Sequence, residues 1–483
     1  MTYLFTETPS FFSDICEEIR LFIDTRRIEC AKAPARAASG LGVEHFFSLT
    51  DGLIASTAKV LQNGETAAEY IYRCPVGSGT LVQKRTAKRA VKISVYRALA
   101  ACFGVKMPWG SLTGIRPTKL LRDSEAALGE EGARSLFINE FDVSPEKYGF
   151  AKSVVDIQKP LMPKACTDID VYIGIPFCVS RCAYCSFASN TLDVFPGAEG
   201  LYMDALAAEL SGAETLLLGK QVRAMYIGGG TPTALGDEHF ETLLKRAAKI
   251  ASGAKEFTVE AGRPDTITPQ KLRAIKAAGA GRISVNAQTL VDDTLLRIGR
   301  HHTAAQFFDA YGMARKTGLQ VNVDLIAGLP GESQRDFTGT LEKIISLDPE
   351  NITVHTLAVK RASAFAAANL NAFPTDTETA KMLCAAQRML EAAGYHPYYM
   401  YRQKYMKGSL ENAGYAKDGK ACLYNIDNME ELLSVAAFGA GAISKRVYGG
   451  GERIERAANL KDLRIYIARV GEMARRKQAL FSG

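Results

Sequence analysis

The stretch Val-Tyr-Ile-Gly-Ile-Pro-Phe-Cys-Val-Ser-Arg-Cys-Ala-Tyr-Cys, residues 171–185, decides how this sequence is interpreted. In it, a short apolar run leads into three cysteines, Cys178, Cys182 and Cys185, with the spacing C-x3-C-x2-C. Three thiolates on one short loop suit a metal centre, and they are one ligand fewer than a cubane iron–sulfur cluster has irons. One iron of such a cluster is left open for another ligand.

Other interpretations of these cysteines explain less. A structural zinc site closes with about four ligands, and no Cys or His pair at zinc-finger spacing lies nearby. Disulfides require an oxidising compartment, to which nothing at the N-terminus directs the chain. A trio of free structural thiols is the alternative without a metal. Tyr184, between the second and third cysteines, fits a loop that shields a cluster from water.

The composition indicates a large globular protein. The chain has 483 residues, of which 47% are hydrophobic and 23% charged, so two or three domains with ample core material are expected. Ten cysteines are too dilute for a disulfide scaffold, and a reduced cytoplasmic location is expected. No uninterrupted apolar stretch reaches about 20 residues, so we expect no membrane insertion. The net charge of +7 is modest, and no nucleic-acid partner is expected.

Residues 1–165 carry no catalytic signature and are expected to form an α+β domain of unassigned role. Asp51-Gly52 and Asn63-Gly64 separate β-prone runs at 44–49, 53–61 and 66–73, a pattern typical of antiparallel hairpins. A long helix fits 80–103. The segment 109–120 is rich in glycine, hydroxyl and basic residues, and it either holds an anion or forms a structural turn before a helix.

Residues 166–365 alternate between short apolar runs and helical segments. The predicted strands are 171–175, 224–227, 257–260, 282–285, 321–326 and 353–357, and the predicted helices are 199–218, 236–252, 268–278, 292–298, 304–317 and 333–347. Repeated β-then-α units predict parallel strands in a partial (β/α)6 barrel, with functional groups at the C-terminal strand ends. Residues 366–483 are expected to form a separate, mainly helical cap with a small β element.

Polar residues follow the predicted strands where ligands of such barrels bind. Gly228-Gly229-Gly230-Thr231-Pro232 follows the second strand, and consecutive glycines let the backbone approach a ligand closely. Glu260 ends the third strand, Gln288 follows the fourth, and Asp324 lies in the fifth. Carboxylates pair with amino groups or accept from hydroxyls, and an amide does both. Each residue alone could anchor a loop, but together they predict a ligand site.

The cysteine loop and glycine turn resemble those of radical S-adenosylmethionine (SAM) enzymes. Residues 172–178 resemble the motif entry of the oxygen-independent coproporphyrinogen III oxidase (dehydrogenase)-like group, in the branch with an N-terminal extension, and the resemblance runs from about 169 to 450. It implies a [4Fe–4S] cluster on the three cysteines and one or two SAM molecules. Its implied SAM contacts are Tyr172, Tyr184, Gly229, Gly230, Thr231, Glu260, Gln288, Arg300 and Asp324.

The resemblance also implies an activity and partners. The reduced cluster donates an electron to SAM, and the resulting 5′-deoxyadenosyl radical abstracts hydrogen from a substrate. Coproporphyrinogen III would be oxidatively decarboxylated to protoporphyrinogen IX in haem biosynthesis, with a low-potential donor such as flavodoxin or ferredoxin. Arg300 would neutralise a carboxylate of SAM or substrate, the bidentate contact that arginine suits. His301 and His302 are assigned no metal.

Several positions depart from the resembled pattern. Porphyrinogen-oxidising members have a cysteine where this chain has Phe187 and a histidine where it has Gly174. Of the haem-chaperone motif His-Asn-x-x-Tyr-Trp, only the asparagine is present, at Asn425. The alternatives are a radical SAM reaction on another substrate, such as methyl transfer, and a haem-binding delivery protein without turnover. Cys166 and Cys422 are expected to be buried thiols rather than further ligands.

Overall fold

The computed structural model describes residues 2–23, 27–34, 40–113, 116–164, 167–187, 189–358, 363, 365, 373–403, 406–451 and 453–482. The chain divides into two compact units. The first comprises Met1–Lys152 with the short pieces Arg402–Lys404 and Gly408–Leu410, and the second comprises the remainder. The division falls after Lys152, within α4 (Pro145–Gln158), whereas the sequence suggested a boundary at 165. The two units are described separately below.

The first unit is an α+β domain built on a five-stranded sheet. Its strand order is β2-β1-β3-β4-β5, with bounds Thr2–Thr6 (β1), Ile28–Cys30 (β2), Leu41–Thr50 (β3), Leu53–Gln62 (β4) and Glu65–Pro75 (β5). Its other helices are α1 (Phe12–Phe22), α2 (Thr80–Phe103) and α3 (Pro117–Ser135). The three predicted hairpin strands and the helix at 80–103 are confirmed. The parallel pairs of β1 with β2 and β3 were not predicted.

The hairpin turns follow from their residue types. Asp51 and Gly52 both have positive φ, and so do Asn63 and Gly64, which is the backbone that a two-residue turn matched to the twist of β-strands requires. Ser56, Ala58 and Val60 of β4 are fully buried, and the intervening residues are half-buried. The sheet therefore buries one face against α1 and α2, as the contacts of α2 with β4 and β5 indicate.

The segment 109–120 contains a packed turn that leads into a helix. Trp109 is 1% exposed, and the guanidinium of Arg402 lies 5.4 Å from its ring centroid. Pro117 occupies the first turn of α3, where a missing N–H costs nothing. The described part of this segment thus forms a turn before a helix; residues 114–115 lie outside the description.

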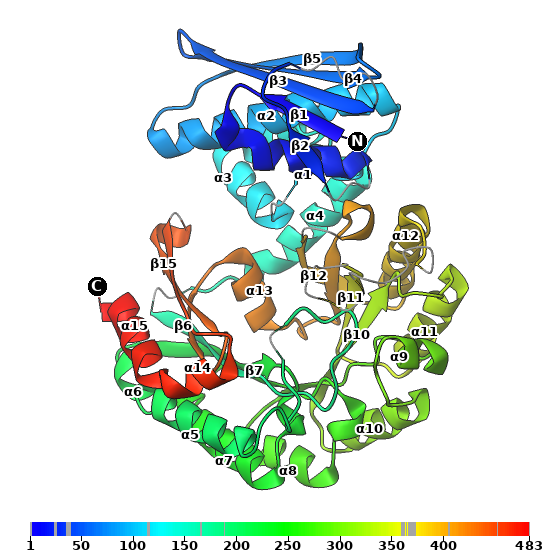
Figure 1. The fold of residues 1–483 in the computed structure, drawn as a ribbon. Coiled ribbons are helices and arrows are strands. Elements are labelled where there is room, and N and C mark those ends of the chain that lie inside the picture. Colours follow the sequence, from blue (N-terminus) through cyan, green and yellow to red (C-terminus); the bar gives the residue numbers. More distant parts are fainter. Residues whose placement is uncertain are drawn as a thin grey trace. The chain divides into compact units, whose positions relative to one another are not determined.

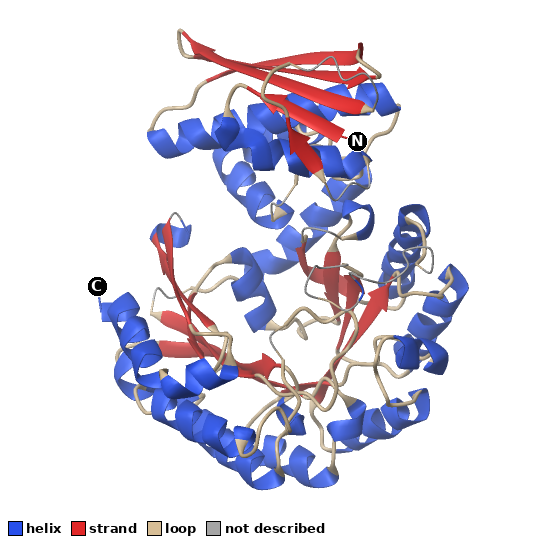
Figure 2. Ribbon diagram, in the orientation of Figure 1, coloured by secondary structure: helices blue, strands red, loops and turns tan. Residues whose placement is uncertain are grey.

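The second unit is the barrel (Figures 1 and 2). Its eleven-stranded sheet has the order β12-β13-β11-β10-β9-β8-β7-β6-β14-β15-β16. Strands β6 to β11 are parallel and have the bounds Asp168–Ile175, Gln221–Gly229, Glu256–Glu260, Arg282–Ser284, Gln320–Ala327 and Asn351–Thr356. The intervening helices are Ala198–Leu210 (α5), Ala213–Leu216 (α6), Asp237–Ile250 (α7), Pro269–Ala277 (α8), Asp292–Arg297 (α9), Ala304–Lys316 (α10) and Gln334–Ser346 (α11). All six predicted strands and the helices between them are confirmed as a partial (β/α)6 barrel.

The C-terminal segment extends the barrel sheet at both edges. Its described residues form the helices Asp376–Ala392 (α12), Leu423–Glu430 (α13), Leu463–Ala468 (α14) and Val470–Ser482 (α15), and the strands His396–Tyr401 (β12), Asn412–Ala416 (β13), Ser434–Phe438 (β14), Ile443–Tyr448 (β15) and Arg453–Ala458 (β16). Strand β13 pairs antiparallel with β11, and β14 pairs parallel with β6. The segment belongs to the same compact unit as the barrel, so the expected boundary at 365 does not separate two units.

A buried carboxylate ties this segment to the first helix of the barrel. Glu209 of α5 accepts hydrogen bonds from the backbone N–H of Gly439, the amide of Asn459, the hydroxyl of Tyr466 and the ammonium of Lys477, all at 2.7–2.8 Å. Both charged side chains are at most 2% exposed. A buried charge is tolerated because it is paired and fully hydrogen-bonded. In the described part of the chain, no helix has both the length and the apolar run that a membrane crossing needs.

Removing the cation of this pair tests its contribution to stability. We expect Lys477→Met to lower the free energy of unfolding by about 3–5 kcal/mol, because Glu209 is then buried without its counter-ion. Arg476→Met on the same helix is the matched control, since its partner Glu472 lies on the surface and such pairs contribute about 0–1 kcal/mol. Denaturant unfolding measures both. Equal losses in the two variants would contradict this account.

Candidate cofactor site at the strand ends

On each of five barrel strands, one half-buried residue lies between two buried neighbours in the chain. They are Tyr172 on β6, Tyr226 on β7, Glu260 on β8, Asp324 on β10 and His355 on β11. Side chains from adjacent strands contact one another around the barrel. The ring centroids of Tyr172 and Tyr226 lie 6.4 Å apart, Tyr226 hydrogen-bonds to Glu260, and Oδ2 of Asp324 lies 3.6 Å from Nε2 of His355. These side chains therefore face one lumen.

The cysteine motif forms a closed loop directly after β6. Phe177 and Asn190 form a parallel bridge, and the backbone N–H of Cys178 donates to the Asn190 carbonyl at 2.9 Å. Within the loop the N–H of Cys185 donates to the carbonyl of Cys182 at 3.0 Å. The three thiols are half-buried. The loop therefore presents its thiols from a fixed base at the end of the first barrel strand.

The surroundings of the thiols suit an iron–sulfur cluster. Burial raises the pKa of Cys178 and Cys185, but Thr231 donates to the Cys178 sulfur at 3.5 Å, and the guanidinium of Arg263 lies 3.9 Å from the Cys182 sulfur. In the described residues no three acidic, histidine or cysteine side chains converge on one metal ion. A cubane does not require this, because each thiolate binds a different iron. The donor set therefore fits a cluster better than a single ion.

The glycine turn after β7 meets the cysteine loop at close range. A Cβ on Gly230 would lie 2.4 Å from the Phe177 carbonyl oxygen and 3.0 Å from the Cys178 sulfur. Gly229 has φ of 109°, which disfavours any side chain. The N–H groups of Gly230 and Thr231 donate at 2.7 Å to the carbonyls of Ile175 and Phe177. The predicted turn residues are thus placed beside the cluster loop.

The two lumen carboxyls have opposite pKa shifts. Burial, reinforced by the charge of Asp324, raises the pKa of Glu260 to about 8. Burial also opposes ionisation of Asp324, but hydrogen bonds from His355, Asn322 and Thr353 outweigh it and lower the pKa of that carboxyl. At neutral pH the lumen therefore holds one protonated and one ionised carboxyl group.

Gln288 and Arg300 complete the predicted set. Gln288 has φ of 63°, and its buried Oε1 lacks a hydrogen-bond partner among the described residues, as a residue held for a ligand would. One terminal N–H group of Arg300 donates to the carbonyls of Gly262 at 3.2 Å and Asn286 at 2.7 Å. Tyr184 and Arg300 both hydrogen-bond to Cys182, so they adjoin the cluster loop.

The structure also locates residues that the sequence argument missed or questioned. Tyr226 and His355 were missed; Tyr226 interrupts an apolar run of β7, whereas β11 contains several polar residues, so His355 does not stand out in its sequence. Cys422 is 3% exposed, as expected for a buried thiol; Cys166 lies outside the described residues. Phe187 is 68% exposed, and a Cβ on Gly174 would lie 3.2 Å from the Tyr172 ring.

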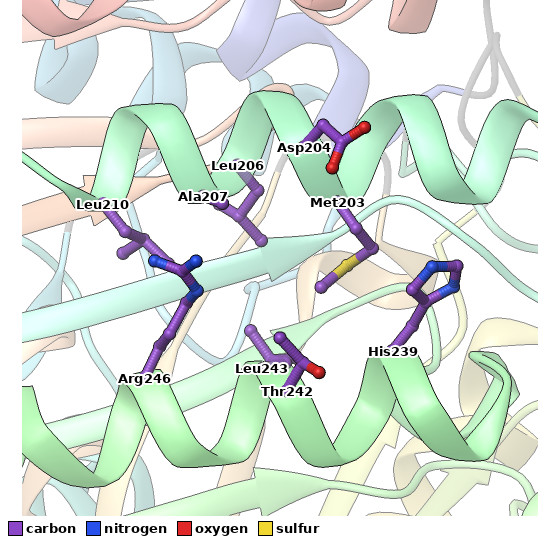
Figure 3. Close-up of a pocket in the computed structure, with 9 residues that line it drawn as sticks. All are labelled: Met203, Asp204, Leu206, Ala207, Leu210, His239, Thr242, Leu243 and Arg246. Atoms are coloured by element: carbon purple, nitrogen blue, oxygen red, sulfur yellow. The ribbon is translucent and has the colours of Figure 1, made fainter.

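Two pockets among the described residues lie away from this lumen. Figure 3 shows a small one, about 100 Å³, between α5 and α7 in the helical layer of the barrel. A larger one, about 610 Å³, is lined by Glu256, Arg282 and Gln320, the first residues of three strands. It therefore lies at the opposite strand ends from the cysteine loop. None of the predicted cofactor residues lines either pocket.

Comparisons with known proteins agree with this geometry. The family model of the radical SAM superfamily matches residues 172–344. The oxygen-independent coproporphyrinogen-III oxidase-like protein HemZ of Bacillus subtilis is 36% identical over 391 residues, 78% of each chain. The heme chaperone HemW of the same organism is 32% identical over 312 residues, 62% of this chain and 76% of HemW. The solved structure of Escherichia coli coproporphyrinogen III oxidase HemN is 22% identical and overlaps with a TM-score of 0.51, covering 69% of this chain and 74% of HemN.

The barrel and its cysteine loop therefore define a radical SAM protein, a class for which a [4Fe–4S] cluster and SAM are the bound groups. Within that superfamily the chain belongs to the oxygen-independent coproporphyrinogen III oxidase-like group, in the branch with an N-terminal extension. Both the resemblance inferred from the motif and the expected fold class are confirmed.

The three motif cysteines are expected to hold one cluster. Anaerobic reconstitution should give about four irons per chain, as the cubane stoichiometry requires. Replacing Cys178, Cys182 or Cys185 by alanine should remove the cluster absorption and the electron paramagnetic resonance signal of its reduced form. Cys384→Ala, at an exposed cysteine on α12, is the matched control. Full iron content in the triple alanine variant would contradict the assignment.

The raised pKa of Glu260 predicts proton release when SAM binds. The folded-state pKa of about 8 exceeds the ordinary 4.5, so the carboxyl of Glu260 is protonated at pH 7. The protonated form contributes stability to the folded protein, and this stability is lost as the pH rises through 8. Pairing with the SAM ammonium requires the ionised form, so affinity should rise between about pH 6.5 and 8. Calorimetry in two buffers of different ionisation enthalpy measures the proton.

Glu260→Gln should abolish the release and weaken SAM binding by about 1.5–3 kcal/mol, the size of a charge-assisted hydrogen bond, without loss of iron. Glu18→Gln is the control, because Glu18 is a buried carboxyl in the first unit whose pKa is also raised to about 8 by burial. Wild-type affinity and proton release in Glu260→Gln would show that this carboxyl does not contact SAM.

Proposed function

We propose that this protein is a radical SAM oxidoreductase that oxidatively decarboxylates coproporphyrinogen III to protoporphyrinogen IX in haem biosynthesis. The observation that carries the proposal is the joint placement of the cysteine loop, the glycine turn and the lumen carboxyls at one end of the barrel. Its relation to an oxidase-like protein over 78% of the chain supports the choice of substrate. A cluster with SAM supplies a carbon radical that abstracts hydrogen.

The chain's own residues would bind and orient the reactants. Gly229 and Gly230 offer backbone groups to the methionine end of SAM, Glu260 pairs with its ammonium, and Asp324 accepts from its ribose hydroxyls. Gln288 turns an unpaired amide oxygen toward the same space. The rings of Tyr172, Tyr226 and Tyr424 stack on one another and would keep water from the reacting carbon on their side of the lumen.

The reaction requires an electron acceptor and an electron donor. Each of the two propionates that react loses a hydrogen atom, carbon dioxide and one electron, so a one-electron acceptor has to collect that electron. A low-potential donor such as flavodoxin or ferredoxin would reduce the cluster. Exposed basic residues on neighbouring loops at this end of the barrel, Arg181 and His301, suit the carboxylates of such a substrate.

Two observations keep another substrate in consideration. Gly174 and Phe187 stand where porphyrinogen-oxidising relatives carry histidine and cysteine, and a side chain at Gly174 would crowd the Tyr172 ring.

A haem-carrier role draws support from the HemW relatives. Against it, Tyr424 is 7% exposed and stacked at 4.8 Å on Tyr226, and Asn425 donates to the Tyr398 hydroxyl at 3.1 Å.

An anaerobic turnover assay tests the proposal. The reconstituted protein with coproporphyrinogen III, SAM and a chemical reductant should consume SAM faster than without the porphyrinogen, and the product mass should fall by two carboxyl groups. Cys182→Ala is the inactive control. SAM cleavage that is equal with and without porphyrinogen would indicate another substrate. Stoichiometric haem binding without any product would indicate a carrier.

A further inference from the structure

His355 lies beside the lumen carboxyls, but no motif contains it. It stands on β11, two residues beyond Thr353, which is the register partner of Asp324 on β10. Its Nε2 lies 3.6 Å from Oδ2 of Asp324, and its Nδ1 lies 3.4 Å from the hydroxyl of Tyr401 on β12. The side chain is 27% exposed within an otherwise buried strand. Tyr401, His355 and Asp324 therefore form a chain across three strands.

The remaining contacts of Asp324 are neutral. The amide of Asn322 donates to its Oδ1 at 2.8 Å, and Asn286 accepts from its backbone N–H at 3.2 Å. Thr353 adds a hydroxyl contact. Oδ2 faces His355, the contact on this carboxyl that can carry a positive charge. One oxygen is thus fixed by an amide, and the other depends on the histidine.

The other titratable groups around Asp324 oppose its ionisation or leave it unchanged. Glu260 on β8 is a competing carboxyl, and Tyr226 on β7 and Tyr399 on β12 are buried phenols with raised pKa values. Tyr401 contacts the far side of the His355 ring, at Nδ1. The buried cation Arg300 acts on Glu260, whose pKa it lowers.

We propose that His355 is a positioning residue that fixes the charge and orientation of Asp324, so that this carboxylate, rather than Glu260, is ionised before SAM binds. The proposal rests on the proposed SAM contacts of the lumen. It does not depend on which substrate the protein transforms. Two like charges in one low-dielectric cavity repel strongly, so a donor group held beside one carboxyl decides which of the two is ionised.

This arrangement would prepare the lumen for SAM. An ionised, oriented Asp324 can accept two ribose hydroxyls without rearrangement. A protonated Glu260 avoids repulsion until the SAM ammonium arrives and stabilises its ionised form. Without His355 the two carboxyls compete for one proton, and Asp324 takes it more often as the pH falls.

The test compares the pH dependence of SAM affinity in variants of the reconstituted protein, without porphyrinogen. His355→Phe removes the donor beside Oδ2 of Asp324, so we expect about a tenfold loss of SAM affinity at pH 6.5, the effect of one charge-assisted hydrogen bond, that shrinks toward pH 8.5. His355→Gln keeps a donor and should retain more SAM affinity at pH 6.5 than His355→Phe. Isothermal titration calorimetry gives the affinities, and in turnover the KM for SAM should rise while kcat stays unchanged.

His396→Gln is the matched control, because His396 also faces an aspartate, Asp418, at 3.6 Å but on the surface. Iron content and thermal midpoint establish that each variant is folded. A loss of affinity that is the same at every pH would reduce His355 to a packing role and overturn the proposal. Wild-type affinity in both His355 variants would also overturn it. Loss of porphyrinogen turnover with this pH pattern intact would contradict only the proposed substrate.

Discussion

The close approach of the first two barrel strands is the constraint on which the candidate site depends. Gly230 touches the Phe177 carbonyl so tightly that no side chain fits, and two short backbone hydrogen bonds join the glycine turn to the residues before the cysteines. A cluster on the loop and a ligand on the turn would therefore be held at a fixed position relative to each other. Orientation of this kind contributes much of the rate in reactions between bound partners.

The two carboxyl groups of the lumen beside this site differ in ionisation state. Glu260 and Asp324 face the same cavity, yet their pKa values move in opposite directions. Burial and the charge of Asp324 raise the pKa of Glu260, whereas at Asp324 the contacts with His355, Asn322 and Thr353 outweigh burial. Carboxyl pairs whose environments separate their pKa values are typical of functional sites. Except for Thr356 after His355, the residues directly before and after each lumen residue are buried and apolar.

Much of this could be predicted from the sequence, because the barrel repeats one local pattern. Apolar runs, helix caps and the C-x3-C-x2-C spacing are local signals, so the six strands and the position of the cluster loop were predicted. His355 and Tyr226 were not, since the sequence of a strand that is buried on both faces does not indicate which of its residues face the lumen. The strands β12 to β16 were missed as part of the barrel sheet because their partners lie far away in the sequence.

The buried ion pair between Glu209 and Lys477 has a consequence for folding during synthesis of the chain. The two residues are 268 positions apart, and β14, which covers the edge of β6, is also made late. At translation rates of about 5–20 residues per second, roughly 15–50 s separate the emergence of the carboxylate from that of its cation. During that interval the nascent chain exposes an unpaired strand edge and leaves an acid without its counter-ion. Final closure of the barrel, and with it a stable base for the cysteine loop, has to wait for the last helix.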